Sequence, residues 1–255
     1  MRRLLPPPDP TTGSTDLSDE DLLREYAYPT DGTWLRANMV ASIDGVASID
    51  GVSEGLSGPA DKRVFGLLRV LADVIIAGAG TVRAEGYRGA DVPERFTEVR
   101  ARAGQPPNPT IAIVSRRLGL DPTTDVFVET TVRPIILTCA ASDRDLRAQL
   151  GEVADVILVG DADVDPIEAR LALEDLGFTR MLCEGGPSLL HDMVAADVVD
   201  ELCLTTSPML LGSGERHLLH PVPLMHPRTA RLSGIIEDDG VLLSRYRIDR
   251  PTPAR

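Results

Sequence analysis

Cysteine is scarce in this sequence and shows no pairing pattern. Cys139, Cys183 and Cys203 are its only three cysteines, and each lies in an apolar run. An odd number without paired ligand spacing matches neither a disulfide framework nor a metal site. Such thiols usually pack as small hydrophobic residues in a reducing compartment. We therefore expect three buried cysteines, no metal site and a cytoplasmic protein.

Long hydrophobic runs are also missing. The chain starts Met1-Arg2-Arg3-Leu4-Leu5 and reaches three prolines before a signal-peptide core can form, and no later run is long enough to cross a bilayer. Residues 6–20 are rich in Pro, Thr, Ser and Asp and have little to bury. The composition predicts a flexible N-terminal tail at 1–25, a single domain at 26–250 and no membrane partner.

Positive charge is in deficit. The 26 Lys and Arg residues face 39 Asp and Glu residues, which gives a net charge of −13. This balance argues against binding to nucleic acid, so an anionic ligand must be held by local geometry. Of the four histidines, His217, His220 and His226 lie in a proline-rich segment without metal-ligand spacing. His191 lies in a predicted helix, where we expect it to pack or to face solvent.

Alternating β-like and helical segments make up most of the chain. Its 255 residues, 43% of them hydrophobic, suffice for a full core. The alternation predicts a layered α/β domain. The expected strands are 34–40, 74–77, 110–114, 134–138, 156–159, 181–183 and 201–206.

Helices and a hairpin are expected between and after these strands. Apolar residues between 64 and 71 have the spacing of a buried helix face, and Gly58-Pro59 starts that helix. Asp165-Pro166 starts a second helix, which ends near Gly177. Segments 230–237 and 241–248 predict an antiparallel hairpin closing one sheet edge. A charged segment followed by a proline-rich break predicts an exposed excursion, or a lid, at 91–109.

The most informative motif is Cys183-Glu184-Gly185-Gly186-Pro187. A predicted strand ends there, passes through two glycines and enters a helix whose first residue is proline. The first turn of a helix has free N–H groups and a positive dipole end, so an anion is stabilised there, and glycines allow close approach. The pattern predicts a phosphate cradle. An ordinary β-to-α turn with a surface Glu184 is the alternative.

Two further motifs occur at the carboxyl ends of predicted strands, where α/β proteins bind ligands. One is Ala77-Gly78-Ala79-Gly80-Thr81, which offers backbone N–H groups and a hydroxyl but lacks the third glycine of a dinucleotide fingerprint. The other is the segment 38–45, Asn-Met-Val-Ala-Ser-Ile-Asp-Gly. In isolation, each is also compatible with a plain turn.

The order of the motifs resembles one known family. A-S-I-D-G, G-P-A-D-K-R-V-F-G-L-L-R, G-A-G-T-V-R-A, E-G-G-P-S-L-L and P-M-L-L-G-S-G follow one another as in the reductase domain of bacterial riboflavin biosynthesis, the RibD C-terminal family. The resemblance covers residues 34–246. It implies a dihydrofolate reductase-like fold: a three-layer α/β/α sandwich with a mainly parallel sheet and a C-terminal antiparallel hairpin.

The activity implied by the resemblance is NADPH-dependent reduction. The ribosyl group of 5-amino-6-(5-phosphoribosylamino)uracil becomes ribityl, in a homodimer. Bifunctional members of the family also carry a zinc deaminase, but this sequence has no H-x-E with a downstream C-x-x-C.

Site residues are carried over by position. Substrate contacts are expected at Asn38, Ser53, Arg69 and Glu184. Cofactor contacts are expected at Val40, Ala41, Gly55, Ser57, Gly78, Gly80, Thr81, Glu85, Ser115, Arg116, Gly185, Gly186, Pro187, Ser188 and Leu189. Because no histidine lies in these motifs, Glu184 and Glu85 are the candidate catalytic groups, as proton relays or substrate anchors. Arg116 or Arg117, after a strand end, is the candidate partner for the 2′-phosphate that distinguishes NADPH from NADH.

The sequence departs from the family pattern on the substrate side. Asn38 stands where the family usually has lysine, and Glu85-Gly86-Tyr87 replaces an aspartate-aspartate-proline run. Arg88 is a candidate to compensate for the lost positive charge. Dihydrofolate or another pteridine therefore stays open as an alternative substrate, with Glu184 or Glu85 as partner of the pterin ring. A non-catalytic NADPH-binding module is the second alternative.

Overall fold

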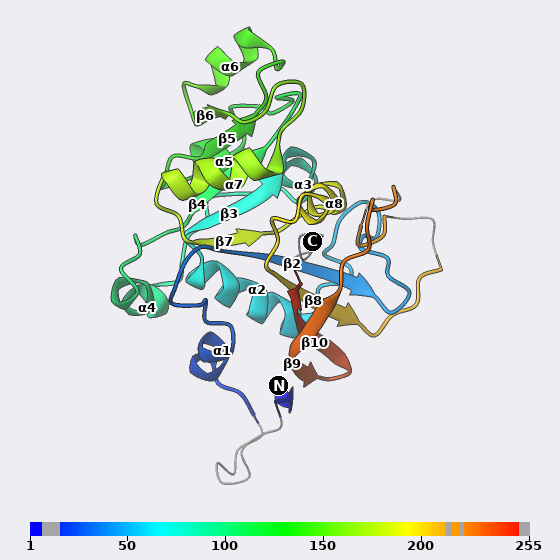
Figure 1. Cartoon of the computed structure of the whole chain (residues 1–255). Coiled ribbons are helices and arrows are strands. Elements are labelled where there is room, and N and C mark those ends of the chain that lie inside the picture. Colours follow the sequence, from blue (N-terminus) through cyan, green and yellow to red (C-terminus); the bar gives the residue numbers. More distant parts are fainter. Residues whose placement is uncertain (7–15, 213–215, 220–221, 250–255) are drawn as a thin grey trace, which may run out of the picture.

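A mixed β-sheet runs through the whole molecule (Figure 1). The computed structural model describes residues 1–6, 16–212, 216–219 and 222–249. Within them, the strands form one sheet in the order β1-β9-β10-β8-β2-β7-β3-β4-β5-β6. The strands are β1 (Arg2–Leu5), β2 (Trp34–Ser42), β3 (Val74–Gly78), β4 (Thr110–Val114), β5 (Ile135–Thr138), β6 (Asp155–Leu158), β7 (Arg180–Cys183), β8 (Glu201–Ser207), β9 (Ala230–Asp238) and β10 (Val241–Ile248).

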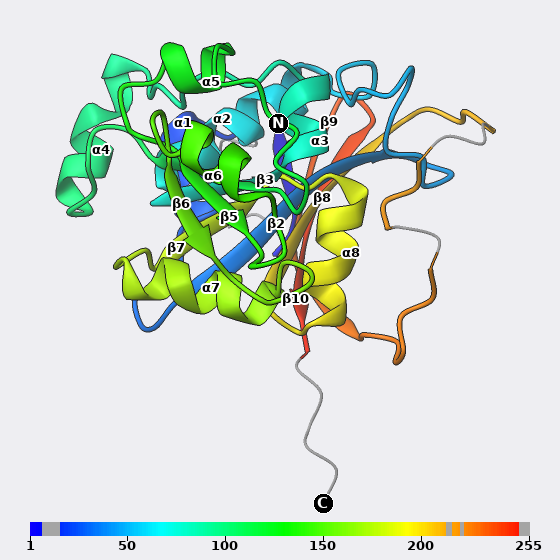
Figure 2. The same ribbon diagram turned by 90° about the horizontal axis from the view of Figure 1, so that it is seen from above.

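Helices cover both faces of the sheet (Figure 2). They are α1 (Asp19–Glu25), α2 (Pro59–Leu71), α3 (Ala79–Ala84), α4 (Thr97–Arg102), α5 (Asp125–Val128), α6 (Arg144–Leu150), α7 (Pro166–Asp175) and α8 (Pro187–Ala195), with a 3₁₀ turn at Glu94–Phe96. Two buried apolar clusters separate the layers. One joins the sheet to α1, α2, α3 and α5, and the other joins it to α7 and α8. The predicted three-layer α/β sandwich is confirmed.

The sheet has a parallel part and an antiparallel part. From β8 to β6, each neighbouring pair is parallel. Strands β2, β3 and β5 are almost entirely buried, as expected for short apolar runs covered by helices on both faces. The remaining pairs, β8 with β10, β10 with β9 and β9 with β1, are antiparallel. The mainly parallel sheet and the C-terminal hairpin are therefore as predicted.

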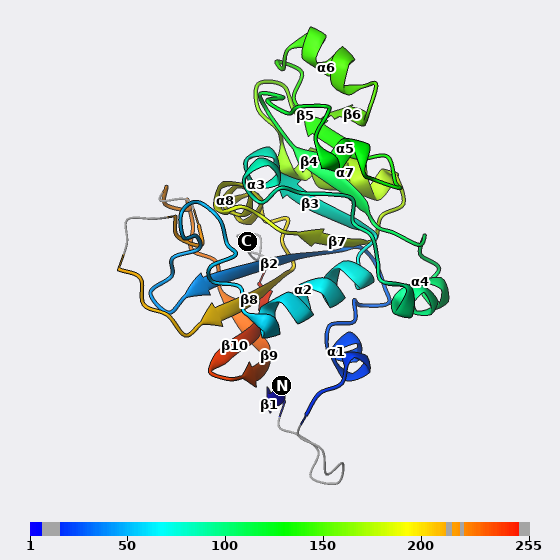
Figure 3. The ribbon, with the colours of Figure 1, turned by 180° about the vertical axis from the view of Figure 1, so that it is seen from behind.

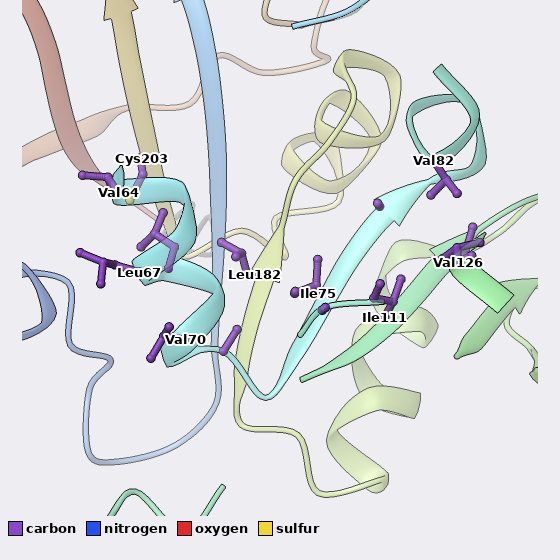
Figure 4. Packing of buried hydrophobic residues seen from close by; sticks show 14 of the residues in the cluster. Val64, Leu67, Val70, Ile75, Val82, Ile111, Val126, Leu182 and Cys203 are labelled. Atoms are coloured by element: carbon purple, nitrogen blue, oxygen red, sulfur yellow. The ribbon is translucent and has the colours of Figure 1, made fainter. Parts of the chain in front are cut away.

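Helix α2 packs its apolar face onto the centre of the sheet. Val64 and Leu67 meet Leu182 of β7 and Cys203 of β8 (Figure 4). Figure 3 shows α2 running beside β2 on this face. All three cysteines are buried and free, as predicted. Burial raises the pKa of Cys183 to about 12 and that of Cys203 to about 12.

The expectation of a flexible tail over residues 1–25 was wrong at both ends. Strand β1 pairs with β9, so the C-terminal hairpin does not form the sheet edge. Helix α1 begins with a capping box at Ser18 and buries Leu22 completely. Both elements are short, but an open strand edge and an apolar surface on α2 give them partners. Residues 7–15 lie outside the described residues.

The segment 91–109 is not placed as a lid. Its Arg100 is buried and donates hydrogen bonds to the carbonyls of Val70 and Ala72, at the end of α2. Burial lowers the pKa of Arg100 to about 10. No residue of 91–109 lines either of the two pockets described below. The segment is an excursion fixed to the far end of α2.

Candidate active site

Strand order brings the three predicted motifs together. Strand β7 lies between β2 and β3 and is parallel to both, so the carboxyl ends of all three strands lie on the same side of the sheet. The segment after β7 contains Glu184, the segment after β3 contains Gly80 and Thr81, and the last part of β2 contains Asn38 and Val40. Motifs more than 30 residues apart in sequence thus meet at the carboxyl ends of neighbouring strands, where ligands of α/β sheets bind.

The two glycine turns contact each other directly. Gly78 N donates to Gly185 O at 2.7 Å, and Gly186 N donates to Thr81 Oγ1 at 2.7 Å. Gly185 has φ +78, and a Cβ at Gly186 would lie 2.8 Å from Thr81 Oγ1. A side chain at either position is therefore excluded, in one case by backbone conformation and in the other by space. The glycines join the starts of α3 and α8.

A first pocket of about 530 Å³ opens between α2, α3 and the ends of β2 and β7. All four expected substrate contacts, Asn38, Ser53, Arg69 and Glu184, line this first pocket. Seven expected cofactor contacts also line it: Val40, Ser57, Gly80, Thr81, Glu85, Gly186 and Pro187. These predicted site residues thus gather in one place, although they come from five separate segments of the chain.

Glu184 is the centre of a charged cluster in the first pocket. Its side chain is 2% exposed. Alternation along β7 places Glu184 on the same face as Leu182, which is the face covered by α2. Arg69 of α2 donates from Nε to Oε1 and from Nη2 to Oε2, both at 2.7 Å. Tyr87 Oη donates to Oε2 at 2.5 Å. Glu184 is therefore held by three hydrogen bonds.

The electrostatics of this cluster favour a cationic Arg69 and a protonated Tyr87 phenol. Burial is the largest single influence on Arg69 and lowers its pKa, but the charge of Glu184, the hydrogen bond to it and the contacts with Tyr87 together outweigh burial and raise the pKa of Arg69. Burial and the Glu184 charge raise the pKa of Tyr87 well above 10. Arg69 also lies over the rings of Phe65 and Tyr87, at 4.4 and 5.2 Å from their centroids. Arg69 is thus fully engaged within the cluster.

Glu85, the second candidate catalytic group, has a different partner. Its carboxylate accepts a hydrogen bond from Ser53 N at 2.7 Å. The contact ties the end of α3 to the segment 47–57, which contributes Ala47, Ser48, Gly51 and Ser53 to the pocket wall. Glu85 therefore shapes the pocket by fixing a loop.

Sequence reasoning missed one stripe of residues in this pocket. Asp61, Phe65 and Arg69 are spaced by four along α2 and all line the pocket, but only Arg69 was expected. Asp61 is 4% exposed and accepts a hydrogen bond from Ser57 Oγ. The i, i+4 spacing of polar and aromatic residues opposite the apolar face of α2 was the available signal. Tyr87 appeared only as a departure from the family pattern.

A second pocket lies on the other side of the glycine turns. Among its lining residues are Gly78, Ser115, Arg116, Ser188 and Leu189, all expected cofactor contacts. Gly80, Pro187 and Arg216 line both pockets, so the two adjoin at the glycine turns. Three expected contacts, Ala41, Gly55 and Gly185, line neither pocket.

The basic residues beside these pockets are mostly paired. Arg116 Nε lies 2.9 Å from Asp163 Oδ1, and both side chains are more than half exposed. Arg88, the expected substitute for the family lysine, faces Asp125 and Glu129 at 3.2 and 3.8 Å. Neither arginine is a ready anion site as it stands.

Histidine and acidic residues form no metal centre in the part of the chain that the structure describes. His191 is buried on α8, and His217 pairs with Val46 through a backbone bridge. His220 lies outside the described residues. Across the described ranges, no helix is both long and apolar enough to span a membrane.

Comparison with known proteins points to one family. The 2,5-diamino-6-ribosylamino-4(3H)-pyrimidinone 5′-phosphate reductase of Archaeoglobus fulgidus is 27% identical over 69% of this chain and 80% of its own length. The protein of the same name from Methanothermobacter thermautotrophicus is 29% identical over 71% and 81%. The crystal structure of a pyrimidine reductase-like protein from Corynebacterium diphtheriae has a TM-score of 0.81 at 25% identity, over 92% of this chain and 100% of that one.

The family match covers both pockets. The model of the RibD C-terminal domain matches residues 33–238, from the start of β2 to the end of β9. Every residue that lines the first or the second pocket falls within this range. The site described above is thus part of the shared domain, and this chain belongs to the RibD C-terminal domain family.

Proposed function

We propose that this protein is an NADPH-dependent reductase of the riboflavin-pathway type. It reduces the ribosyl group of 5-amino-6-(5-phosphoribosylamino)uracil to ribityl. The observation that carries the proposal is the cluster of buried Glu184 with half-buried Arg69 and Tyr87, in a pocket that adjoins a second one at two glycine turns. A substrate and a nicotinamide dinucleotide need such adjoining pockets, since hydride transfer requires their reacting carbons to meet.

The residues present fit a dinucleotide. Gly186 has no room for a Cβ beside Thr81, so the backbone is bare where α8 starts, and the N–H groups of the first turn of α8 have no partners within the helix. Ser188 and Leu189 of that turn line the second pocket, with Ser115 across from them. NADPH would supply the hydride. The first and second pockets, which adjoin at the glycine turns, would hold the two halves of NADPH.

Glu184 serves as an acceptor for a substrate hydroxyl. Its Oε2 already accepts from Arg69 and Tyr87, whereas Oε1 accepts from a single donor among the described residues, Arg69 Nε. A carboxylate oxygen has two lone pairs, so Oε1 keeps one for a ligand in the pocket. A ribosyl chain carries several hydroxyl groups that match this acceptor. Arg69 and Tyr87 fix the orientation of the carboxylate, and Glu85 keeps the pocket wall in place through Ser53.

A second candidate substrate comes from the archaeal relatives. Their names specify a diaminopyrimidinone ribosylamine phosphate rather than the uracil. Both compounds carry the same phosphoribosylamino group, which is the part that Glu184 would contact. In keeping with the resemblance, we further propose a homodimer in the cytoplasm, which sedimentation analysis and cell fractionation would test.

The experiment that tests the proposal is the loss of NADPH absorbance on addition of purified protein. The uracil, the diaminopyrimidinone and dihydrofolate are assayed side by side, and NADH replaces NADPH in a parallel set. Fast turnover of the uracil with NADPH supports the proposal. Turnover of the diaminopyrimidinone alone changes the substrate but keeps the reaction. Turnover of dihydrofolate alone, or NADP⁺ binding without any turnover, overturns the assignment.

A further inference from the structure

Arg216 occupies an unusual position at the junction of the two pockets. Among the described residues it is one of three that line both pockets, and the other two, Gly80 and Pro187, belong to the first turns of α3 and α8. A dinucleotide that fills both pockets must pass this junction with its central diphosphate. Arg216 is the only one of the three with a charged side chain, and it is exposed.

The other cations around the two pockets are mostly neutralised. Lys62 faces Glu54 at 3.2 Å, and Arg69, Arg88 and Arg116 each face a carboxylate within 4 Å. Arg83 donates to the carbonyl of Gly119. Within the described ranges, no carboxylate lies within salt-bridge distance of Arg216 or Arg117. Arg117 lines only the second pocket. Arg216 is therefore the available cation at the junction.

The described residues around Arg216 contact the segment 44–47, a turn that the proposed chemistry does not use. Ala47 N donates to Arg216 O at 2.7 Å, and Val46 pairs with His217. The carboxylate of Asp44 accepts from Gly212 N at 2.7 Å. Contacts from Asp44 of the A-S-I-D-G motif and from the two residues after that motif thus hold Gly212, Arg216 and His217.

We infer that Arg216 binds the diphosphate of the cofactor where it crosses from one pocket to the other. The inference rests on the proposed function, because it takes the ligand to be a nicotinamide dinucleotide. A guanidinium offers several donors in one plane and forms charge-assisted hydrogen bonds with phosphoryl oxygens. The phosphate ester of a substrate has the same chemistry, so the experiment must separate the two sources.

The test is direct binding of NADP⁺ and NAD⁺ to the full chain, measured by calorimetry without substrate. Arg216→Ala is expected to weaken both cofactors by the same factor, roughly tenfold, because both contain the diphosphate. Arg216→Lys keeps the charge and loses less. Because the side chain is exposed, the affinity of the native chain should fall more steeply with added salt than that of Arg216→Ala. Arg102→Ala, on α4 and far from both pockets, is the matched control and should change neither affinity.

Four results would overturn the inference. Unchanged binding of both cofactors removes any role for Arg216 in cofactor binding. A loss of affinity for NADP⁺ but not for NAD⁺ would show that Arg216 binds the 2′-phosphate and not the diphosphate. A raised KM for the phosphorylated substrate with unchanged cofactor affinity assigns Arg216 to the substrate phosphate. Because binding is measured without turnover, a chain that binds NADP⁺ but reduces nothing counts against the proposed function alone. Failure of the native chain to bind either cofactor overturns both.

Discussion

The two pockets differ in how their charges are held. In the first pocket, Glu184 is 2% exposed and Arg69 24% exposed, and the half-buried Tyr87 donates a hydrogen bond to the carboxylate of this ion pair. In the second pocket, the Arg116–Asp163 pair is 57% and 68% exposed. Buried pairs have fixed geometry and are costly to break, whereas exposed pairs are weak and are screened by salt. We therefore expect the first pocket to control turnover and stability, and the second to control affinity.

The largest effect is expected for Glu184→Gln. The amide keeps the shape but leaves Arg69 without a counter-charge and gives the substrate hydroxyl a weaker acceptor. We expect kcat/KM to fall by about 10²–10³ and the free energy of unfolding by about 2–3 kcal/mol, with Arg69 partly exposed to water. Steady-state kinetics and urea unfolding measure the two quantities.

A matched control for this variant lies outside the pockets. Glu201 accepts from Arg36 Nε at 2.6 Å, and the two side chains are 4% and 1% exposed. Glu201→Gln should lower stability by a similar amount and leave NADP⁺ affinity unchanged. If both variants lost stability while only Glu201→Gln lost turnover, the first pocket would not be the active site.

Gly186→Ala is expected to affect both pockets. Its Cβ would lie 2.8 Å from Thr81 Oγ1, so the contact between the two glycine turns must shift. We expect a loss of about 1–3 kcal/mol in stability and roughly tenfold weaker NADP⁺ binding. Gly66→Ala on α2, where nothing lies within 4 Å of the added atom, should be neutral or slightly stabilising. Equal behaviour of the two variants would show that the turns are not coupled.

Tyr87→Phe separates orientation from charge in the first pocket. It removes the donor to Glu184 at 2.5 Å but keeps the ring beside Arg69. Because the Tyr87 pKa is raised well above 10, the phenol stays protonated at neutral pH and cannot act as a base. We expect kcat/KM to fall about five- to tenfold, equivalent to about 1 kcal/mol, with the same neutral pH profile as the native chain. If kcat/KM of Tyr87→Phe varied with pH between about pH 6 and pH 9 in a way that the native chain does not, this role would be contradicted.

The pH dependence of folding should reveal Asp44, which holds the segment next to Arg216. Hydrogen bonds from Ser42 Oγ and from Gly212 and Leu211 N lower its pKa to about 2, from 3.8. A lowered folded-state pKa contributes stability above pH 3.8, and that contribution is lost as the pH falls toward about 2. In acid titrations followed by circular dichroism, Asp44→Asn should lack this part of the decline. An identical acid profile would show that Asp44 is not the group responsible.

The fold was largely predictable because its periodic signals are local. Helix α2 and helix α7 begin at Pro59 and Pro166 as expected, and the buried parallel strands are short apolar runs. Strand β1 and helix α1 were missed because four and seven residues carry too little pattern, and their stability comes from partners far along the chain.

The sequence predicted the parts of the candidate site that depend on backbone conformation. It did not predict the contacts between side chains that are far apart in the chain. Glycine turns are visible as glycines, so the segments around Gly80 and Gly186 were found. Tyr87 and Glu184 are 97 positions apart, and only the placement of β7 beside β3 brings them within hydrogen-bond distance. Arg116 was expected on the strength of its position after β4, but its pairing with Asp163 depends on a loop whose path is not written in local sequence.

The smallest effect is expected for Arg116→Ala, and it tests the exposed side of the comparison most directly. Asp163 already forms an ion pair with Arg116, and water screens both charges. Arg116→Ala should therefore change the preference for NADPH over NADH by less than about threefold. Arg117 lines the same pocket and has no carboxylate partner within the described ranges, so Arg117→Ala should reduce the preference more, by about tenfold. Asp163→Asn frees Arg116 and should raise NADPH affinity if that arginine can reach the 2′-phosphate. The ratio of kcat/KM with NADPH to kcat/KM with NADH, measured at low and high salt, shows which of Arg116 and Arg117 determines the cofactor preference. A larger effect of Arg116→Ala than of Arg117→Ala would mean that the Arg116–Asp163 ion pair opens when the cofactor binds.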